Sequence, residues 1–216
     1  MIHYKPRVYL TVPNGEGMMH KSVHFAVIRL LQDPRFNIRH DCPTHRPFEN
    51  NLHHCIQDFL KGGEDFWLSI DNDNPPTANV LDRVLDDLDF VGFPTPVYHN
   101  TLNGERPWYW NAYKKHSEKE GYNEWPVQSG LQNVDAVGTG CFLASRRVMA
   151  HPLMAAPFLR RCDDEGRVIR GNDIAFCERA KMAGFDIWAD FDRPCEHFVT
   201  IPMIETIKSI NSVRNN

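Results

Sequence analysis

Two aspartates, Asp71 and Asp73, stand one residue apart directly after the apolar segment 66–70. Pro75 and Pro76 follow, so a strand through this segment has to end at the aspartates. Carboxylates at the end of a buried strand occupy the edge where open α/β sheets bind ligands. Two such close carboxylates repel each other unless a cation lies between them. Hard oxygen ligands suit Mg²⁺ or Mn²⁺, whose coordination shell is commonly completed by substrate phosphates. These residues predict a site for a metal-bound diphosphate.

The same residues also have a purely structural interpretation. Asx side chains hydrogen-bond their own backbone and proline fixes φ, so Asp71 to Pro75 equally suits a plain turn. The local sequence does not decide between the two. An EF-hand calcium loop is a poor match, because its third ligand would be Pro75 and its obligatory glycine would be Pro76.

A second group of ligand-type residues combines Cys42 and His45 with His53, His54 and Cys55. Thiolate and imidazole are zinc ligands, but the second half of the group lacks the spacing of a zinc finger. A structural zinc and ordinary packing both stay open, and packing is the preferred interpretation.

Length and composition describe one globular domain. The chain has 216 residues, of which 42% are hydrophobic and 24% charged, enough for a single α/β core. The formal net charge of −4 gives no general footprint for a nucleic acid. With no charged start before an apolar run and no apolar stretch of spanning length, the sequence predicts a soluble, unprocessed, cytoplasmic protein. A local basic groove stays open, from Lys114, Lys115, Arg146, Arg147, Arg160 and Arg161.

The cysteines are even in number but widely scattered, which predicts reduced, mostly buried thiols. They are Cys42, Cys55, Cys141, Cys162, Cys177 and Cys195.

The elements that must position the two aspartates alternate along the first half of the chain. Such alternation predicts a mostly parallel, doubly wound sheet. Strand patterns occupy residues 7–12, 36–40, 66–70 and 89–94, and helical patterns occupy 20–31, 51–60 and about 80–88.

The second half is less regular. Residues 96–130 are rich in Trp, Tyr, Asn, Gly and Pro without a clean period, which predicts an aromatic insert serving mainly as a satellite core or else as a ligand platform. Asn172 is a good N-cap for a helix to Ala183, and Gly184 a natural C-cap. The remaining expectations are a strand over 131–137, a strand over 141–144 that leads into a helix from Ser145, a mobile loop over 160–171, a strand over 185–189 and a short helix over 201–210.

Several segments, taken together and in this order, resemble the GT-A glycosyltransferases, especially the family 2-like group that uses nucleotide sugars. The resemblance covers roughly residues 7–198 and matches the aromatic insert least well. It implies one Rossmann-like GT-A domain: a mostly parallel sheet flanked by helices, with a small antiparallel C-terminal portion. Residues 1–95 would bind the nucleotide sugar, 96–200 would form the acceptor and catalytic half, and 201–216 a tail. The segments are Pro13-Asn14-Gly15, Asp71-x-Asp73, Gly138-Thr139-Gly140-Cys141-Phe142-Leu143 before Arg146-Arg147, Asp173 to Cys177, Gly184 to Trp188, and Cys195-Glu196-His197.

The resemblance assigns a cation, Mn²⁺ or Mg²⁺, to the donor diphosphate. Asp73 would be the direct ligand, Asp71 would support it or touch the donor, and His197 would supply a further ligand. A divalent cation there would stabilise the charge that develops on the leaving diphosphate. Imidazole beside carboxylate oxygens favours Mn²⁺ over Ca²⁺.

The resemblance also assigns the donor contacts. The loop after the first strand would meet the base and ribose, Asp41 would contact the base, and a guanidinium at Arg46 would pair with phosphate oxygens. A solvated turn surface is the alternative for Arg46. The full donor set is Thr11, Pro13, Asn14, Glu16, Asp41, Arg46, Asn50, Asp71 and Asn72.

Asp173 would be the catalytic base that takes the proton from the acceptor hydroxyl. Such a base needs a pKa raised towards neutrality, whereas a helix N-terminus lowers the pKa of a carboxylate, so simple capping is the alternative. The family pattern usually has Glu-Asp where this chain has Asn172-Asp173. The acceptor and sugar would further meet Trp110, Gly138, Thr139, Gly140 and Asn172, although a tight turn explains the two glycines equally well.

The resulting prediction is a metal-dependent glycosyltransferase that moves a sugar from a nucleotide-diphosphate sugar, preferably a UDP-sugar, to an acceptor hydroxyl with inversion. The acceptor stays open among glycans, proteins, small molecules and modified nucleic acids. One alternative is a sugar-1-phosphate nucleotidylyltransferase, which would need an arginine in the loop after the first strand. The other is a nucleotide-sugar or carbohydrate-binding module without catalysis.

Overall fold

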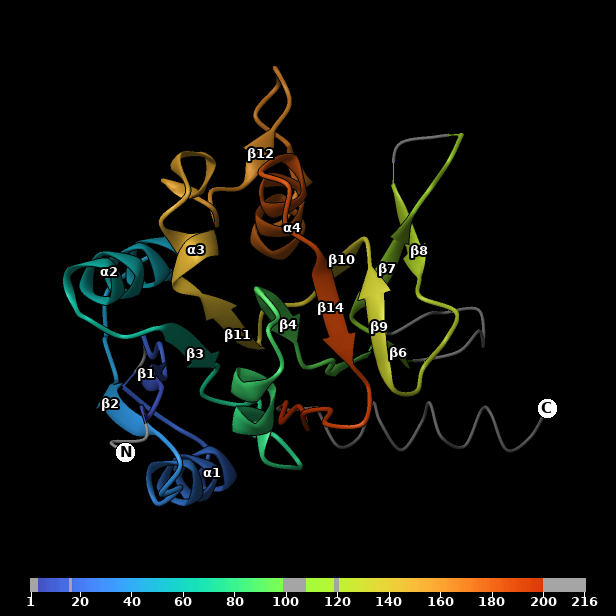
Figure 1. The fold of residues 1–216 in the computed structure, drawn as a ribbon. Coiled ribbons are helices and arrows are strands. Elements are labelled where there is room, and N and C mark those ends of the chain that lie inside the picture. Colours follow the sequence, from blue (N-terminus) through green and yellow to red (C-terminus); the bar gives the residue numbers. More distant parts are fainter. Residues whose placement is uncertain (1–3, 16, 99–107, 119–120, 200–216) are drawn as a thin grey trace, which may run out of the picture.

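The computed structural model describes residues 4–15, 17–98, 108–118 and 121–199. In these residues the main sheet has seven strands in the order β2–β1–β3–β11–β4–β14–β9 (Figure 1). Five strands share one direction and β11 and β9 run opposite, so the predicted mostly parallel α/β sheet is confirmed. The bounds are β1 Arg7–Thr11, β2 Asn37–Asp41, β3 Phe66–Ile70, β4 Phe90–Gly92, β9 Leu131–Val134, β11 Cys141–Ser145 and β14 Ile187–Asp190.

Helices cover both faces of this sheet (Figure 1). Successive strand residues point to opposite faces, so Tyr9 packs with one cluster and its neighbours Val8 and Leu10 with the other. The first cluster is covered by α2 (Phe48–Lys61), α3 (Arg146–Met149) and α4 (Asn172–Met182). The second is covered by α1 (Lys21–Leu31) and the 3₁₀ helix η1 (Val80–Leu85).

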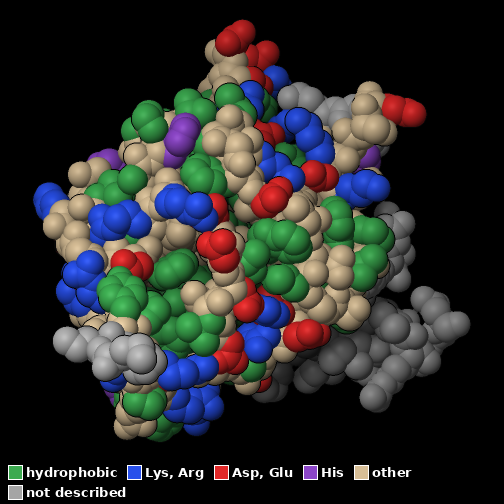
Figure 2. Space-filling model, in the orientation of Figure 1, with side chains coloured by type: hydrophobic (Ala, Val, Ile, Leu, Met, Phe, Trp, Pro, Cys, Tyr) green, Lys and Arg blue, Asp and Glu red, His purple; other side chains and the backbone are tan. Residues whose placement is uncertain are grey.

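On the face of the molecule in Figure 2, acidic and basic side chains are interspersed, which matches the small net charge of the chain. No helix in the described part of the chain combines the length and apolarity needed to cross a bilayer.

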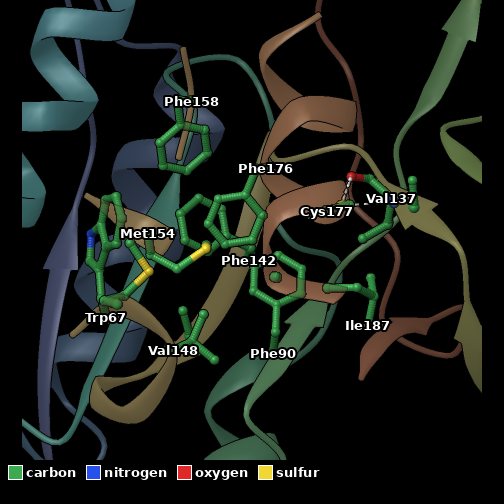
Figure 3. Packing of buried hydrophobic residues seen from close by; sticks show 14 of the residues in the cluster. Trp67, Phe90, Val137, Phe142, Val148, Met154, Phe158, Phe176, Cys177 and Ile187 are labelled. Carbon is green, nitrogen blue, oxygen red and sulfur yellow. Dashed lines mark hydrogen bonds between the residues drawn. The ribbon is translucent and has the colours of Figure 1, made fainter. Parts of the chain in front are cut away.

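An aromatic stack forms the centre of the first cluster (Figure 3). Trp67 of β3 meets Phe142 of β11 edge-on, with ring centroids 4.9 Å apart. Phe158 stacks on Phe176 of α4 at 4.8 Å. Phe90 of β4 also contacts Phe176 at 4.8 Å. These contacts fix the first turns of α4 against the middle of the sheet.

The antiparallel strand β11 lies between β3 and β4, and this position matters for the two aspartates. Cys141 is opposite Ile70, so the residues before β11 meet the residues after β3 at the same edge. The Asp71 N–H donates to the Gly140 carbonyl over 2.7 Å. Distant segments of the sequence thereby share one edge of the sheet.

Three regions differ from their sequence expectations. The insert, expected to be irregular, contains β5 (Pro96–Tyr98), β6 (Trp108–Trp110), β7 (Ala112–Lys115) and β8 (Tyr122–Glu124). The single strand expected over 131–137 is two strands. The chain changes sheets at Asp135, whose N–H donates to the Tyr113 carbonyl, and β10 (Ala136–Val137) then belongs to the small sheet β10–β7–β8. The loop expected over 160–171 contains a hairpin of β12 (Arg161–Cys162) and β13 (Val168–Arg170).

Several helices also differ in type or in their ends from the sequence expectations. The amphipathic helix expected near 80–88 is the 3₁₀ helix η1, started by Asn79, whose side chain accepts from the Leu81 N–H. Asn172 is the first residue of α4 rather than its cap, because Gly171 holds the cap position without a side-chain bond. Gly184 follows the helix at φ +89°, as expected of a terminating glycine. A short 3₁₀ helix, η2 (Pro152–Met154), follows α3. The helix expected over 201–210 lies outside the described residues.

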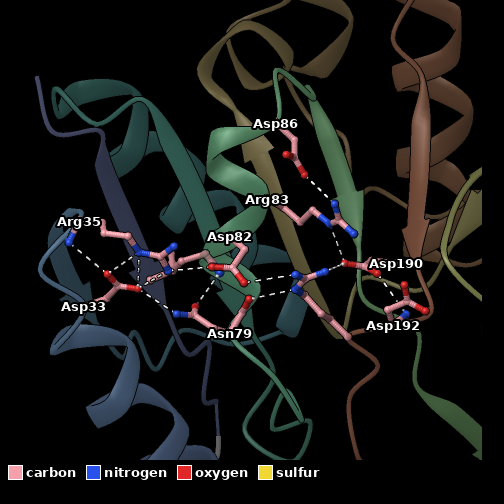
Figure 4. A network of polar contacts seen from close by, with 10 residues as sticks. Asp33, Arg35, Asn79, Asp82, Arg83, Asp86, Asp190 and Asp192 are labelled. Atoms are coloured by element: carbon pink, nitrogen blue, oxygen red, sulfur yellow. Dashed lines mark hydrogen bonds and ion pairs between the residues drawn. The ribbon is translucent and has the colours of Figure 1, made fainter.

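A polar network ties the end of α1 to η1 and to the end of β14 (Figure 4). At its centre Asp190 is fully buried and accepts from Arg83 Nε over 2.7 Å and from Arg193 Nη1 over 3.2 Å. Arg193 also pairs with Asp82 of η1 at 3.2 Å. The network therefore anchors the chain where it leaves the sheet towards its last described residues.

Arg146, at the start of α3, closes the end of α2. Its guanidinium donates to the carbonyls of Phe59, Leu60, Gly62 and Glu64 over 2.7, 3.2, 3.1 and 2.6 Å, and it lies over the Phe59 ring. A cation there satisfies carbonyls that have no partner within the helix.

We expect Arg146→Met to lower the free energy of unfolding by about 2–3 kcal/mol, because several carbonyls lose a charged donor. Urea denaturation measures this. The matched control is Arg147→Met, whose side chain is 67% exposed and pairs with Asp89 at the surface. It should change stability by less than about 1 kcal/mol. Equal effects of the two substitutions would contradict the role of Arg146.

Candidate functional site

A cleft of about 980 Å³ opens at the end of the sheet where β1 and β3 finish. That volume reaches the upper end of the roughly 300–1,000 Å³ typical of ligand sites. The loop after β1 contributes Pro13, the start of α1 contributes His20, and the turn after β3 contributes Asn72 and Asp73. Further lining residues are Gly15, His45, Arg46, Phe48 and Phe198.

The last described segment of the chain runs antiparallel to the turn that carries the two aspartates. The Glu196 N–H donates to Pro75 and the Phe198 N–H to Asp73, both over 3.0 Å. Pro76 and Cys195 form an isolated antiparallel bridge. This seam, formed by residues 73–76 and 195–198, brings His197 beside Asp73.

The geometry of His197 suits a cation at this position. Its Nδ1 lies 3.0 Å from the Pro96 carbonyl, an acceptor only, so Nδ1 carries the proton of the neutral ring. Nε2 then presents its lone pair to Asp73 Oδ2, 3.7 Å away. Two acceptors that face each other are compatible with a cation or a proton between them.

Asp71 lies deeper, beside Gly140 and Asn74. Its Oδ1 atom is buried and makes no hydrogen bond. Burial raises the pKa of Asp71 well above its usual value, and the charges of Asp173 and Asp73 raise it further. The orphaned oxygen fits a divalent cation or a donor group close to the two aspartates.

Asp173 lies in the first turn of α4, and its charge acts on Asp71. Its Oδ1 accepts from the Thr139 hydroxyl over 2.5 Å, and Thr139 is only 5% exposed. Burial raises the pKa of Asp173, although the bonds from Thr139 lower it. A raised pKa is one of the properties that a general base requires. The Asn172 side chain accepts from the Asp173 N–H over 3.1 Å.

Among the residues near the end of β1 that were expected to contact the nucleotide-sugar donor, Pro13 lines the cleft. Thr11 does not, because its hydroxyl is fully buried and accepts from Trp67 Nε1 over 2.8 Å. Asn14 is 6% exposed and lies 3.4 Å from the Asn72 amide, which also donates to the Met18 carbonyl over 2.7 Å. Asn14 thus supports the turn. Glu16 lies outside the described residues.

The other donor candidates fall on both sides of the start of α2. Arg46 lines the cleft, where its Nε donates to the Gly15 carbonyl over 2.5 Å. Asp41, at the end of β2, accepts from the Cys42 N–H over 2.8 Å and does not line the cleft. Asn50 lines a smaller, separate cavity, and its amide donates to the Arg46 carbonyl over 3.4 Å.

The residues expected to approach the sugar mainly pack against protein. A Cβ at Gly138 would collide with Asn111, and one at Gly140 with Asn74, so these glycines permit close packing of neighbouring loops. Trp110 is half-buried and meets Phe191 edge-on at 6.4 Å, which makes it a satellite-core residue.

The possible zinc group does not assemble. Cys55 is fully buried in the first core cluster, whereas Cys42 Sγ contacts His40 Nε2 at 3.4 Å. The His45 and His54 rings lie 4.0 Å apart, and His54 pairs with Asp58. Within the described residues, no three His, Cys, Asp or Glu side chains gather as a complete protein metal centre. A cation at Asp73 and His197 would therefore need further ligands from substrate or water. Four of the six cysteines are buried, as predicted.

Sequence reasoning missed three features near the site. Tyr113 has a raised pKa through burial, the adjacent Tyr109 and the charge of Asp173, which places it near the proposed base. His20 stacks on Phe198 with centroids 3.7 Å apart, closing one end of the seam. Arg160 pairs with Glu49 at 2.5 Å across the start of α2. None follows a motif, so only the tertiary contacts reveal them.

Comparison with known proteins establishes fold but no activity. No family model and no curated protein matches the chain. Protein A197 from STIV is 13% identical, with a TM-score of 0.56 over 91% of this chain and 87% of that chain. The inositol-1-phosphate CTP transferase from T. maritima is 9% identical, with a TM-score of 0.43 over 96% of this chain and 97% of that chain. The chain thus shares an overall α/β fold with A197.

The raised pKa of Asp71 predicts how the free energy of unfolding depends on pH. The stability that a raised folded pKa contributes is fully present below the unfolded value, about 3.9, and is lost as pH rises through the folded pKa. Asp71→Asn removes that loss. Without divalent metal, we expect the variant to have a larger free energy of unfolding than the wild type at pH 8. The advantage should shrink as the pH falls towards 4.

Urea denaturation with EDTA, at several pH values from 4 to 8, measures both curves. The control is Asp164→Asn, which removes one negative charge from an exposed position of the β12–β13 hairpin. Equal or lower stability of Asp71→Asn at pH 8 would show that the buried carboxylate carries no such cost.

Proposed function

We propose that this protein is a glycosyltransferase of the GT-A type, which transfers a sugar from a nucleoside-diphosphate sugar to an acceptor hydroxyl. The observation that carries the proposal is the pairing of His197 Nε2 with Asp73 at 3.7 Å, at the edge of a cleft of about 980 Å³. The charges of Asp73 and Asp173 both act on Asp71, and burial raises the pKa of Asp71 and of Asp173.

The donor would occupy the large cleft. Arg46 lies where its guanidinium could meet phosphate oxygens, and His20 and His45 add polar rings to the same wall. Asp73 and His197 would hold a divalent cation, Mn²⁺ or Mg²⁺, with Asp71 in support. When bound, such a cation stabilises the negative charge on the leaving diphosphate. A UDP-sugar is the proposed donor.

Transfer would use the partly buried carboxylate of Asp173. The acceptor oxygen attacks the anomeric carbon, its proton passes to Asp173, and the bond from that carbon to the diphosphate oxygen breaks with the electron pair on the diphosphate. Thr139 holds Asp173 over 2.5 Å and orients it. Attack from the face opposite the leaving group inverts the anomeric centre. Asn172 interacts with the Asp173 backbone, and a side chain that cannot ionise is sufficient for that contact.

Turnover tests the function directly. With Mn²⁺ and a panel of nucleotide sugars, we expect at least one donor to bind and to release its nucleoside diphosphate. Binding without release would identify a binding module. Release of pyrophosphate from a nucleoside triphosphate and a sugar 1-phosphate would identify a nucleotidylyltransferase. Failure of every donor to bind would refute the proposal.

Two substitutions separate the proposed roles. Asp73→Ala should weaken Mn²⁺-dependent donor binding at least about tenfold by calorimetry, because a direct cation ligand is lost. Asp173→Asn should keep donor affinity while lowering turnover by about 10²–10⁴-fold, the usual contribution of a general base.

The exposed Asp87→Ala serves as the control for both variants. Unchanged turnover in Asp173→Asn would exclude that residue as the base. Unchanged Mn²⁺ dependence in Asp73→Ala would exclude it as a ligand.

A further inference from the structure

A second, smaller cavity of about 210 Å³ lies between α2 and the segment 156–159. It is separate from the large cleft, although neighbouring residues of α2 line the two: Phe48 lines the cleft and Glu49 lines the cavity. Because sites for drug-sized ligands measure roughly 300–1,000 Å³, this cavity suits a single ring rather than a nucleotide sugar.

The walls of the cavity differ in chemistry. One side carries Glu49, Asn50 and His53 of α2, which together offer a carboxylate, an amide and an imidazole. The opposite side carries Pro157 and Phe158, which are buried and present apolar surface. A sugar ring has the matching character, since its C–H faces pack on apolar groups and its hydroxyls bond polar side chains.

The cavity connects to the proposed base through two contacts. Phe158 stacks on Phe176 at 4.8 Å, and Phe176 lies one turn after Asp173 on α4. Arg160, directly after the segment 156–159, pairs with Glu49 at 2.5 Å. The positive charge of Arg160 also acts on Asp173 and partly opposes the effect of burial on its pKa. The apolar wall of the cavity therefore packs directly on the helix that carries Asp173.

The segment that forms the apolar wall is held in place. Arg179 Nη1 donates to the Pro157 carbonyl over 2.6 Å and to the Leu159 carbonyl over 3.0 Å. The cavity is thus defined by a braced main chain and a helix, which gives it a shape before any ligand binds.

We propose that this cavity is the acceptor subsite and that it takes one glycosyl ring, so that the acceptor is a carbohydrate. The assignment as an acceptor subsite rests on the proposed function. The binding of a sugar ring to the cavity does not, and it can be measured alone.

Ala156→Trp tests the proposal by filling the cavity from its rim, since Ala156 is exposed and lines it. The matched control is Ala155→Trp, an exposed neighbour that does not line the cavity. The probes are the methyl α- and β-glycosides of glucose, galactose, mannose and N-acetylglucosamine, detected by saturation-transfer NMR with and without UDP and Mn²⁺.

At least one glycoside should bind the wild type and Ala155→Trp, and should bind Ala156→Trp at least tenfold more weakly. His53→Ala, which removes a polar partner without filling space, should weaken the same glycoside several-fold. Unfolding temperatures of all three variants report whether they fold. Full glycoside binding by a folded Ala156→Trp, or no glycoside binding by the wild type, would overturn the proposal.

Donor binding, measured by calorimetry with UDP-sugars and Mn²⁺, separates this inference from the proposed function. If donor turnover is intact and Ala156→Trp does not change glycoside binding, the acceptor subsite alone is refuted. If Ala156→Trp loses glycoside binding and the wild type binds no donor, the cavity is supported as a sugar-binding site and the proposed glycosyltransferase function is refuted.

Discussion

The candidate site depends on the main-chain seam between residues 73–76 and 195–198. Hydrogen bonds from Glu196 to Pro75 and from Phe198 to Asp73, with the Pro76–Cys195 bridge, join two segments separated by about half of the chain. Neither segment belongs to a regular strand, so the seam needs support from both ends. The buried Asp190, held by Arg83 and Arg193, anchors the chain before it, and the His20–Phe198 stack closes it.

Burial sets the chemistry of the carboxylates. Asp71 and Asp173 lie at the meeting point of β3, the loop before β11 and the first turn of α4, and each has a raised pKa with burial as the main cause. Folding therefore keeps groups in an environment that disfavours their charge. Functional sites often show this pattern, because a bound partner, such as a cation or a proton donor, reduces the free-energy cost of the buried charge that the ligand-free protein bears.

Sequence reasoning located the elements best where periodicity and chain breakers agreed. The strand into Asp71, bounded by apolar residues and prolines, and the helix that became α1 lie within one residue of their predicted positions. Sequence reasoning did not locate the short strands of the insert. A strand such as Trp108–Trp110 shows no hydrophobic period of its own and forms by pairing with Pro96–Tyr98. Thr11 illustrates the limit for side chains. Its place at the end of a buried strand suggested the cleft, yet its hydroxyl is buried and accepts a hydrogen bond from the Trp67 indole.

The sequence by itself determined the alternation of strands and helices, the carboxylates at the end of the third strand, and the order of the segments that resemble a glycosyltransferase. These are local properties, which follow from side-chain type and spacing along a short stretch of chain. Tertiary structure decided which of those residues meet. Whether Asp73 faces His197, whether burial raises the pKa of Asp173, and whether Cys55 can reach Cys42 depend on strand order and on the position of β11. Those are set by packing between residues far apart in the chain, which no local pattern records.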